Sequence, residues 1–231
     1  MQQIQHNLTA LNQRIADACA ACGRDVDEIT LIGVSKTKPA EDVRAAASLG
    51  ITNLGENYLD EAISKIAACA ALDLTWHYIG RIQSNKTKAI AANFHWVHTV
   101  ERSKIAQRLA QQCPEGKSIN VLLQINVDRD PAKAGVIPED AAPLLEAIQA
   151  HPKLRPRGLM TILAADSDPR ASYESVAQLA QRLTPLLDQA ARKGWNALSM
   201  GMTGDLEHAI AAGATHIRIG TALFGARQRR V

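Results

Sequence analysis

The sequence predicts an α/β protein with a single domain over residues 1–231, folded as a closed (β/α)8 or TIM barrel. Short runs rich in Val, Ile and Leu alternate with longer Ala-rich segments of helical period. Strict alternation of strand and helix favours parallel strands joined by right-handed crossovers. Eight such units fit a barrel, which typically has ~250 residues. An open doubly wound sheet is less favoured, because no G-x-G-x-x-G follows the first strand.

The predicted strands lie at Ile29–Lys36, Ile51–Glu56, Leu74–Gly80, His95–Val100, Ile119–Val127, Leu154–Ile162, Asn196–Gly201 and His216–Leu223. Several helices between them have clear boundary signals, such as Pro39 and Gly50 around the first. These helices are predicted at Ala40–Leu49, Glu139–Ala150, Pro169–Lys193 and Leu206–Ala212. An amphipathic helix at about Ile4–Ala21 precedes the first strand.

The overall charge is modest, because 26 Lys and Arg against 23 Asp and Glu give a net charge of +3. That is too small to favour nucleic acid or an anionic membrane as the main partner. No run approaches the roughly 20 apolar residues of a membrane span, and the first residues lack a signal peptide. We therefore expect a cytoplasmic protein. The basic C-terminal tail, with Arg227, Arg229 and Arg230, is interpreted as a solvated end.

The C-x-x-C pair Cys19 and Cys22 lies at the end of the first predicted helix, which Gly23 closes. A thioredoxin-type site needs its first Cys at a helix start that follows a strand, where the thiolate is stabilised. We therefore interpret both residues as thiols that pack the helix rather than as a redox pair.

Lys36 is the first candidate for chemistry, because barrel sites lie where strands end and helices begin. Period-2 alternation places Lys36 on the same strand face as Ile32 and Val34. If that face lines the barrel, the Lys36 amine lies at the mouth of an apolar tube, which favours the neutral, nucleophilic form that a Schiff base requires. The alternative is that the chain turns after Ser35 and Lys36 extends into water.

Two loops near the C-terminus have the composition of an anion site. After the seventh strand a Gly-spaced turn leads into a helix, and Ser199 and Thr203 add hydroxyl donors. After the eighth strand, Gly220 and Thr221 bring backbone N–H groups near, and Arg218 lies beside Gly220 on the strand. Phosphate sites formed by these two loops are common in barrels. The alternative is that the glycines only terminate the helix and the strand.

An amine and a phosphate cradle at one mouth suit pyridoxal 5′-phosphate (PLP), with an aldose or ketose phosphate as the other candidate. Seven motifs carry a resemblance to a known family: Val34–Pro39, Gly55–Tyr58, Trp76–Gly80, Gln83–Lys86, Gly158–Met160, Ser199–Met202 and Arg218–Gly225. In this order and spacing, from about residue 5 to residue 227, they resemble the pyridoxal phosphate homeostasis protein family. The combination is highly specific, although no single motif is.

The resemblance implies a fold-type III PLP barrel related to the N-terminal domain of alanine racemase, with PLP held as an aldimine on Lys36. It implies that Arg218 lies near the pyridine nitrogen. It also implies phosphate contacts from Ser199, Met202, Thr203, Gly220 and Thr221. Family members show no clear turnover and are thought to hold, buffer or deliver PLP, so apo forms of PLP-dependent enzymes are candidate partners. Thr203 stands where we expect Ser, and it keeps the hydroxyl.

The residue chemistry bears on catalysis independently. Enzymes that use PLP as a strong electron sink often pair the pyridine nitrogen with a carboxylate, and Arg218 cannot accept that proton. A racemase also needs a second acid/base, which in alanine racemases is a partner subunit's Tyr. The only tyrosines here are Tyr58, Tyr78 and Tyr173, and Tyr78 points away from the lumen if His77 points in. We therefore predict no catalytic residue, and a monomer because no second domain follows.

Two other functions remain open. One is a PLP-dependent racemase or aldolase acting on a small amino acid. The other is a Schiff-base aldolase on a sugar phosphate without PLP, which would need a carboxylate and a second Lys beside Lys36. No such pair is evident among the inward-facing strand positions.

The remaining candidates each have a structural alternative. Asn57 is expected at the cofactor ring or as a turn cap, His77 beneath the ring or as a core histidine, and Met160 on the ring face or in the core. His95 and His98 are three apart on one strand and face opposite sides, so we predict no metal site there. Finally, Lys86 and Lys133 lie near strand–helix junctions and are candidates for a second PLP site. The alternative is that they are solvated, and this alternative is favoured for Lys133.

Overall fold

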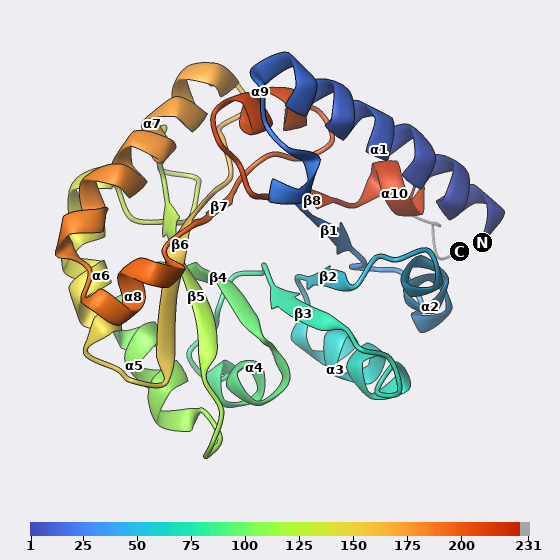
Figure 1. Ribbon diagram of the computed structural model, residues 1–231. Coiled ribbons are helices and arrows are strands. Elements are labelled where there is room, and N and C mark those ends of the chain that lie inside the picture. The colour runs from blue at the N-terminus through green and yellow to red at the C-terminus, as the bar shows by residue number, and fades with distance from the viewer. Residues whose placement is uncertain (227–231) are drawn as a thin grey trace.

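The computed structural model describes residues 1–226, which contain a closed barrel of eight parallel strands in sequence order (Figure 1). The basic tail at residues 227–231 lies outside the described residues. The strands are β1 (Thr30–Val34), β2 (Asn53–Glu56), β3 (Thr75–Tyr78), β4 (Trp96–Val100), β5 (Ile119–Ile125), β6 (Leu154–Thr161), β7 (Ala197–Ser199) and β8 (His216–Ile219). Pairing of β8 with β1 closes the barrel, so the predicted (β/α)8 fold is confirmed.

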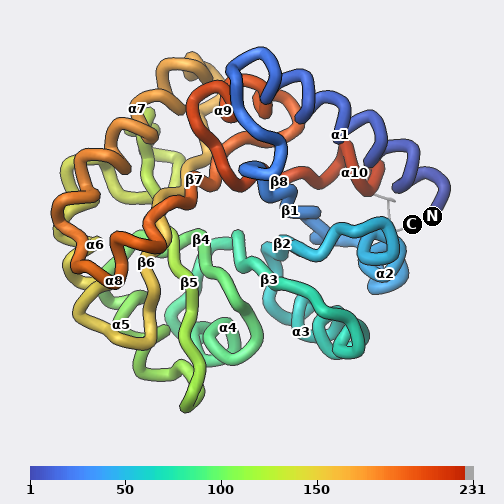
Figure 2. Tube along the Cα trace, viewed as in Figure 1, coloured from blue at the N-terminus to red at the C-terminus, as the bar shows by residue number. Residues whose placement is uncertain are grey.

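Helices surround the strands as an outer ring, which is clearest in the tube view (Figure 2). They are α2 (Ala40–Ser48), α3 (Leu59–Ala68), α4 (Thr87–Asn93), α5 (Ser103–Gln112), α6 (Ala141–Gln149), α7 (Pro169–Leu183), α8 (Gln189–Gly194), α9 (Leu206–Ala211) and α10 (Thr221–Phe224). Short 3₁₀ turns η1 (Val26–Glu28), η2 (Pro138–Asp140) and η3 (Thr184–Leu186) complete the set. The sequence has no comparably clear boundary signals at α3, α4 and α5, so the bounds of these helices were not predicted.

The predicted N-terminal helix is α1 (Gln2–Cys22), which lies across α9 and α10 in Figure 1. Its buried residues Ile4, Leu8, Leu11 and Ile15 recur at the spacing of one helix face, so that face packs on the barrel. No described helix combines the length and the apolar character that a membrane span requires.

Most predicted strands are shorter in the structure, and two predicted elements differ from it most. The helix expected over Pro169–Lys193 breaks into α7, η3 and α8, because Pro185 has no N–H to donate and Asp188 caps a new helix by accepting from the Ala191 N–H. The strand expected to run to Leu223 stops at Ile219. The chain turns at Gly220, whose carbonyl oxygen accepts from the N–H groups of residues 223 and 224 and so begins α10.

Close packing around two glycines establishes which face of β1 lines the barrel. A Cβ at Gly55 would lie 2.9 Å from the Cγ2 atom of Ile32 and 3.4 Å from that of Val34. A Cβ at Gly33 would instead meet the side chain of Leu223 in the outer layer. Ile32 and Val34 therefore face the interior, as predicted. The strand ends at Val34 rather than at Lys36, so Lys36 lies in the turn that follows the carboxyl end of β1.

Candidate cofactor site

The main predicted residues gather at one rim of the barrel. Lys36 follows β1, Asn57 follows β2, Thr203 follows β7, and Gly220 follows β8. Strands β7, β8, β1 and β2 are neighbours in the closed sheet, so these loops adjoin one another at the carboxyl ends. Lys36 is half-buried there. A lysine and two loops with anion-site composition thus share one side of the mouth, which is the arrangement that the sequence predicted.

Arg218 on β8 lies inside the barrel and is only 4% exposed. Its Nη1 donates to the carbonyl oxygen of Ser199 at 2.6 Å and to the Ser199 hydroxyl at 2.9 Å, while Nη2 donates to the Thr161 carbonyl oxygen at 2.8 Å. Burial lowers the pKa of Arg218 to about 10, so the guanidinium stays protonated at neutral pH. The guanidinium is therefore a fixed buried cation held by β6 and β7.

A hydrogen-bonded chain continues from Ser199 across the interior. The Ser199 hydroxyl lies 2.8 Å from His98 Nδ1, His98 Nε2 lies 2.9 Å from His77 Nδ1, and His77 Nε2 lies 2.9 Å from Asn53 Oδ1. A guanidinium can only donate, so the Ser199 hydroxyl accepts from Arg218 and donates to His98. Each imidazole then donates to the next acceptor. The buried Arg218 cation thereby determines which atom donates in each hydrogen bond from Ser199 to Asn53.

The environment of three interior histidines favours their neutral forms. Burial lowers the pKa of His77 and of His98 well below the usual value, and burial with the nearby Arg218 charge lowers that of His216 to about 4. These three rings form one aromatic cluster with Trp96, with ring centroids 5.1 to 6.4 Å apart. Neutral imidazoles provide both a donor and an acceptor, which the one-directional chain needs.

The two rim loops offer backbone donors. Among the described residues, the N–H groups of Thr203, Gly204, Gly220 and Thr221 have no hydrogen-bond acceptor. A set of uncommitted N–H donors at one rim fits an anionic group such as a phosphate. The N–H of Met202 is different, because it donates to Asp205 Oδ1 at 2.6 Å.

The turn that contains Met202 and Thr203 is fastened from two sides. The Tyr173 hydroxyl donates to Asp205 Oδ2 at 2.8 Å, and the Arg14 guanidinium donates to the Thr203 carbonyl oxygen at 3.0 Å. The Met202 side chain is 40% exposed. A contact from Met202 to a phosphate therefore stays a prediction, and its main-chain N–H is already committed to Asp205.

Asn57, His77 and Met160 occupy different environments. Asn57 Oδ1 is buried and has no hydrogen-bond partner among the described residues, which is the feature expected of a side chain that awaits a ligand. His77 is a satisfied interior histidine. Met160 is fully buried and packs with Leu122 and Ala197, below the rim.

Comparisons with known proteins show the family of this chain. The family model described as "Alanine racemase, N-terminal domain" matches residues 1–228. A pyridoxal phosphate homeostasis protein of Pseudomonas aeruginosa is 49% identical over 228 residues, covering 98% of this chain and 97% of that protein. The protein of the same name from Escherichia coli K12 is 42% identical over 231 residues, covering 98% of each.

This chain belongs to the pyridoxal phosphate homeostasis protein family. The structure of PipY from Synechococcus elongatus, solved with PLP bound, is 36% identical to it with a TM-score of 0.78. The match covers 91% of this chain and 100% of PipY. The resemblance inferred from the seven motifs is therefore confirmed at full length.

One buried ion cluster, next to the loop that carries Lys36, was not predicted from the sequence. Lys65 on α3 contacts Glu56 at 2.5 Å and Glu61 at 2.6 Å, and it donates to the Ser35 carbonyl oxygen at 2.6 Å. A lysine in the middle of an amphipathic helix gives no signal of such a role, because most such lysines are solvated. The helical i, i+4 spacing of Glu61 and Lys65 was the only available hint.

Two lysines near the rim are engaged with protein groups. Lys86 Nζ contacts Asp60 Oδ1 at 3.0 Å, and Lys38 Nζ donates to the carbonyl oxygens of Phe224 and Ala226 at 2.9 Å each. A second PLP site at Lys86 or Lys133 stays a prediction. No group of His, Cys, Asp and Glu in residues 1–226 has the arrangement of a metal site.

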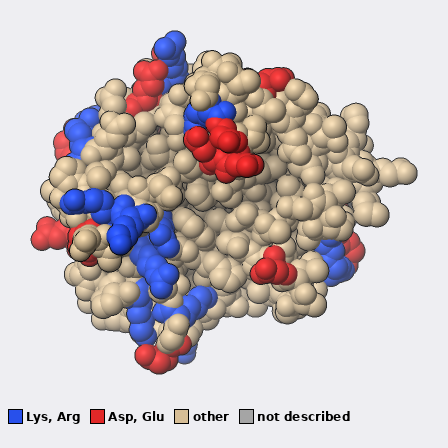
Figure 3. Space-filling view, in the orientation of Figure 1, with Lys and Arg blue, Asp and Glu red and all other residues tan. Residues whose placement is uncertain are grey.

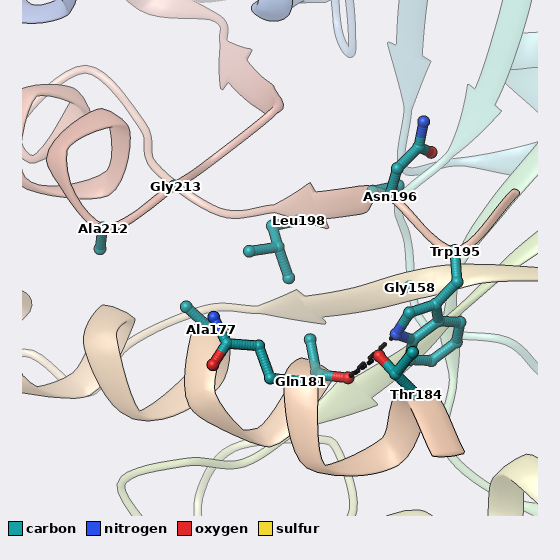
Figure 4. A pocket seen from close by; sticks show the side chains of 11 residues that line it. Gly158, Ala177, Gln181, Thr184, Trp195, Asn196, Leu198, Ala212 and Gly213 are labelled. Atoms are coloured by element: carbon teal, nitrogen blue, oxygen red, sulfur yellow. Dashed lines mark hydrogen bonds between the residues drawn. The ribbon is translucent and has the colours of Figure 1, made fainter. Parts of the chain in front are cut away.

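One hollow adjoins the predicted residues, because Asn57, Tyr58 and Lys86 line it, and another lies away from them. A cavity of about 290 Å³ between α7 and strands β6 and β7 is lined by Gly158, Gln181 and Trp195, whose indole N–H donates to the Ala180 carbonyl oxygen at 3.1 Å (Figure 4). Lys and Arg side chains gather in a band over α8 and the first residues of β5 and β6 (Figure 3). That band is at the opposite ends of the strands from the candidate cofactor site.

Proposed function

We propose that this protein binds PLP covalently through Lys36 and acts in intracellular PLP homeostasis without strong catalytic turnover. The observation that carries the proposal is the shared rim, where Lys36 adjoins two loops with uncommitted N–H donors. Attachment forms a bond from the Lys36 nitrogen to the aldehyde carbon of PLP, and one water leaves. When bound, PLP supplies an electron-withdrawing pyridine ring.

The protein groups have distinct roles in this proposal. Thr203, Gly204, Gly220 and Thr221 hold the phosphate through their N–H groups, and the two threonine hydroxyls add donors. Arg218 faces the pyridine nitrogen as a donor, and Asn57 Oδ1 supplies an acceptor near the ring. Ser199, Met202, His77 and Met160 stay predictions as direct contacts.

The lack of turnover follows from the same chemistry. A donor such as Arg218 cannot keep the pyridine nitrogen protonated, so the ring withdraws electrons less strongly. Two of the three tyrosines are engaged elsewhere, because Tyr78 packs against Phe94 in the outer layer and Tyr173 is bonded to Asp205, whereas Tyr58 is exposed beside Asn57. These features favour a carrier over a racemase. All four cysteines are free, which suits the cytoplasm, and we propose a monomer that delivers PLP to apo enzymes.

The test is an absorbance spectrum of the purified protein with PLP, before and after borohydride. We expect a visible band that borohydride removes, with a phosphopyridoxyl mass on Lys36. Lys36→Ala should lose the band, whereas Lys193→Ala at an exposed site on α8 should keep it. A band that survives in Lys36→Ala, or none in the wild type, would overturn the proposal. Robust racemisation of a free amino acid would overturn the carrier role alone.

A further inference from the structure

A buried ion cluster lies on the outer side of the loop that carries Lys36. We define it as Glu56, Glu61 and Lys65. Lys65 is 4% exposed and Glu56 is fully buried. Lys65 Nζ lies 2.5 Å from Glu56 Oε1 and 2.6 Å from Glu61 Oε1. Burying such groups costs free energy even where they pair, and Glu56 Oε2 is buried without a hydrogen-bond partner among the described residues, so the cluster needs a reason beyond packing.

The cluster bonds to the backbone on both sides of Lys36. Lys65 Nζ donates to the carbonyl oxygen of Ser35 at 2.6 Å, and the Ser35 hydroxyl donates to Glu56 Oε1 at 2.5 Å. On the other side, the N–H of Thr37 donates to Glu61 Oε1 at 2.6 Å. The residues immediately before and after Lys36 are thus held by one set of charges.

The backbone at Thr37 requires such support. Thr37 has a φ of 64°, the left-handed region that β-branched residues rarely adopt. Without the bond from its N–H to Glu61, Thr37 is free to relax to an ordinary conformation. Relaxation rotates the peptide that follows Lys36 and changes the direction of the Lys36 side chain, because Cα–Cβ directions follow the backbone.

We infer that the Glu56–Glu61–Lys65 cluster is a positioning device that aims the Lys36 amine at the cofactor aldehyde. This inference rests on the proposed function, because it concerns the same lysine. The three residues act through Ser35 and Thr37, on either side of Lys36. A loop held in this way needs little ordering when the cofactor attaches.

Glu61→Ala tests the inference, because the Glu61 side chain is 32% exposed and its removal leaves the buried Glu56–Lys65 pair in place. We expect the affinity for covalently attached PLP to fall about tenfold or more, as for loss of a hydrogen bond to a charged group. In the protein without PLP, hydrogen exchange of the peptide containing residues 35–38 should be faster. Glu174→Ala, which removes an exposed partner of Arg170 on α7, is the matched control and should change neither quantity.

A rescue variant distinguishes a role of the cluster in positioning Lys36 from a contribution to the stability of the whole protein. Asn adopts the left-handed region more readily than Thr, so Thr37→Asn in the Glu61→Ala background should recover most of the lost PLP attachment. Glu61→Gln, which keeps an acceptor oxygen for the Thr37 N–H, should lie between the wild type and Glu61→Ala.

The outcomes are distinguishable. If the wild type itself carries no borohydride-trapped PLP on Lys36, the proposed function fails and this inference fails with it. If the wild type is labelled and Glu61→Ala matches Glu174→Ala in PLP affinity and in exchange, the inference alone is wrong. A lower melting temperature in Glu61→Ala with unchanged PLP attachment would also overturn it, since the cluster would then serve stability only.

Discussion

Arg218 and Ser199 are joined by two hydrogen bonds, from Nη1 to the Ser199 carbonyl oxygen at 2.6 Å and to its hydroxyl at 2.9 Å. The second bond makes Ser199 the link between a buried cation and a chain of neutral imidazoles. Ser199 therefore has two candidate roles, as a partner of Arg218 or as a ligand of the phosphate. The two roles predict different effects of the same substitution.

Ser199→Ala removes the hydroxyl and leaves His98 Nδ1 without its donor. We expect the free energy of unfolding to fall by about 1–3 kcal/mol, the usual cost of an unsatisfied buried polar group. If Ser199 acts through Arg218, the affinities for PLP and for pyridoxal should fall together. A loss confined to PLP would instead identify Ser199 as a phosphate ligand. Urea denaturation measures the free energy of unfolding, and ligand titration measures the affinities for PLP and pyridoxal. The exposed Ser175→Ala is the control.

Stability should depend on pH through the buried histidines. The unfolded chain protonates histidine below about pH 6.5, whereas burial keeps the folded pKa of His216 at about 4, so unfolding takes up protons. The free energy of unfolding should therefore fall as pH drops from about 6.5 to 4, by about 1.4 kcal/mol per pH unit for His216. His77 and His98 act in the same direction. Burial raises the pKa of Glu56, which has the opposite sign and offsets part of the loss.

Urea denaturation between pH 4 and pH 8 checks this dependence. His216→Gln should make the slope shallower by about one proton. His6→Gln, at an exposed position on α1, should leave the slope as it is. A slope that His216→Gln does not change would mean that His216 is already protonated in the folded protein.

Tyr173→Phe should loosen the turn that contains Met202. The ring of Tyr173 is buried and would keep its packing, but Asp205 Oδ2 would lose its 2.8 Å hydrogen bond. Because Asp205 Oδ1 holds the Met202 N–H, we expect a loss of about 1 kcal/mol in stability and a weaker affinity for PLP. Pyridoxal, which lacks the phosphate, serves as the internal control. Equal weakening for both ligands would contradict a phosphate role for this turn.

Thr203→Ala and Thr221→Ala test the phosphate loops directly. Each removes a hydroxyl donor and leaves the backbone N–H groups in place, so each should weaken PLP binding by about threefold to tenfold. Pyridoxal affinity should not change. Thr9→Ala, at an exposed position of α1, is the control. Unchanged PLP affinity in the variant with both substitutions would mean that neither hydroxyl contacts the phosphate.

The C-x-x-C pair should not behave as a redox site. Cys19 is fully buried, and burial raises the pKa of its thiol, whereas Cys22 is exposed at the end of α1. We expect a thiol reagent to label Cys22 alone in the folded protein and all four cysteines in denaturant. Rapid labelling of Cys19, or a Cys19–Cys22 disulfide in mild oxidant, would contradict the interpretation as packing thiols.

The sequence by itself determined the barrel and the rim at which the candidate residues gather. Alternation of strand-like runs and helical segments specifies parallel strands, and period 2 along Ile32 and Val34 already places Lys36 at the mouth. Glycine and threonine after β7 and β8 likewise marked the rim loops. These features are readable because they depend on local periodicity and on the order of elements in a closed sheet.

Only the tertiary structure decided which side chains meet across elements. Lys65 on α3 reaches Ser35 on the loop after β1, and His98 on β4 reaches Ser199 on β7, 101 residues away in sequence. The break in the helix expected over Pro169–Lys193 and the short helix that follows β8 likewise depend on turns that outweigh the general pattern. Pairings between distant residues depend on barrel closure and on the burial of charges, neither of which a local pattern records. The contacts of Lys65 and Glu61 with the backbone on both sides of Lys36 therefore depend on closure of the strands into a ring.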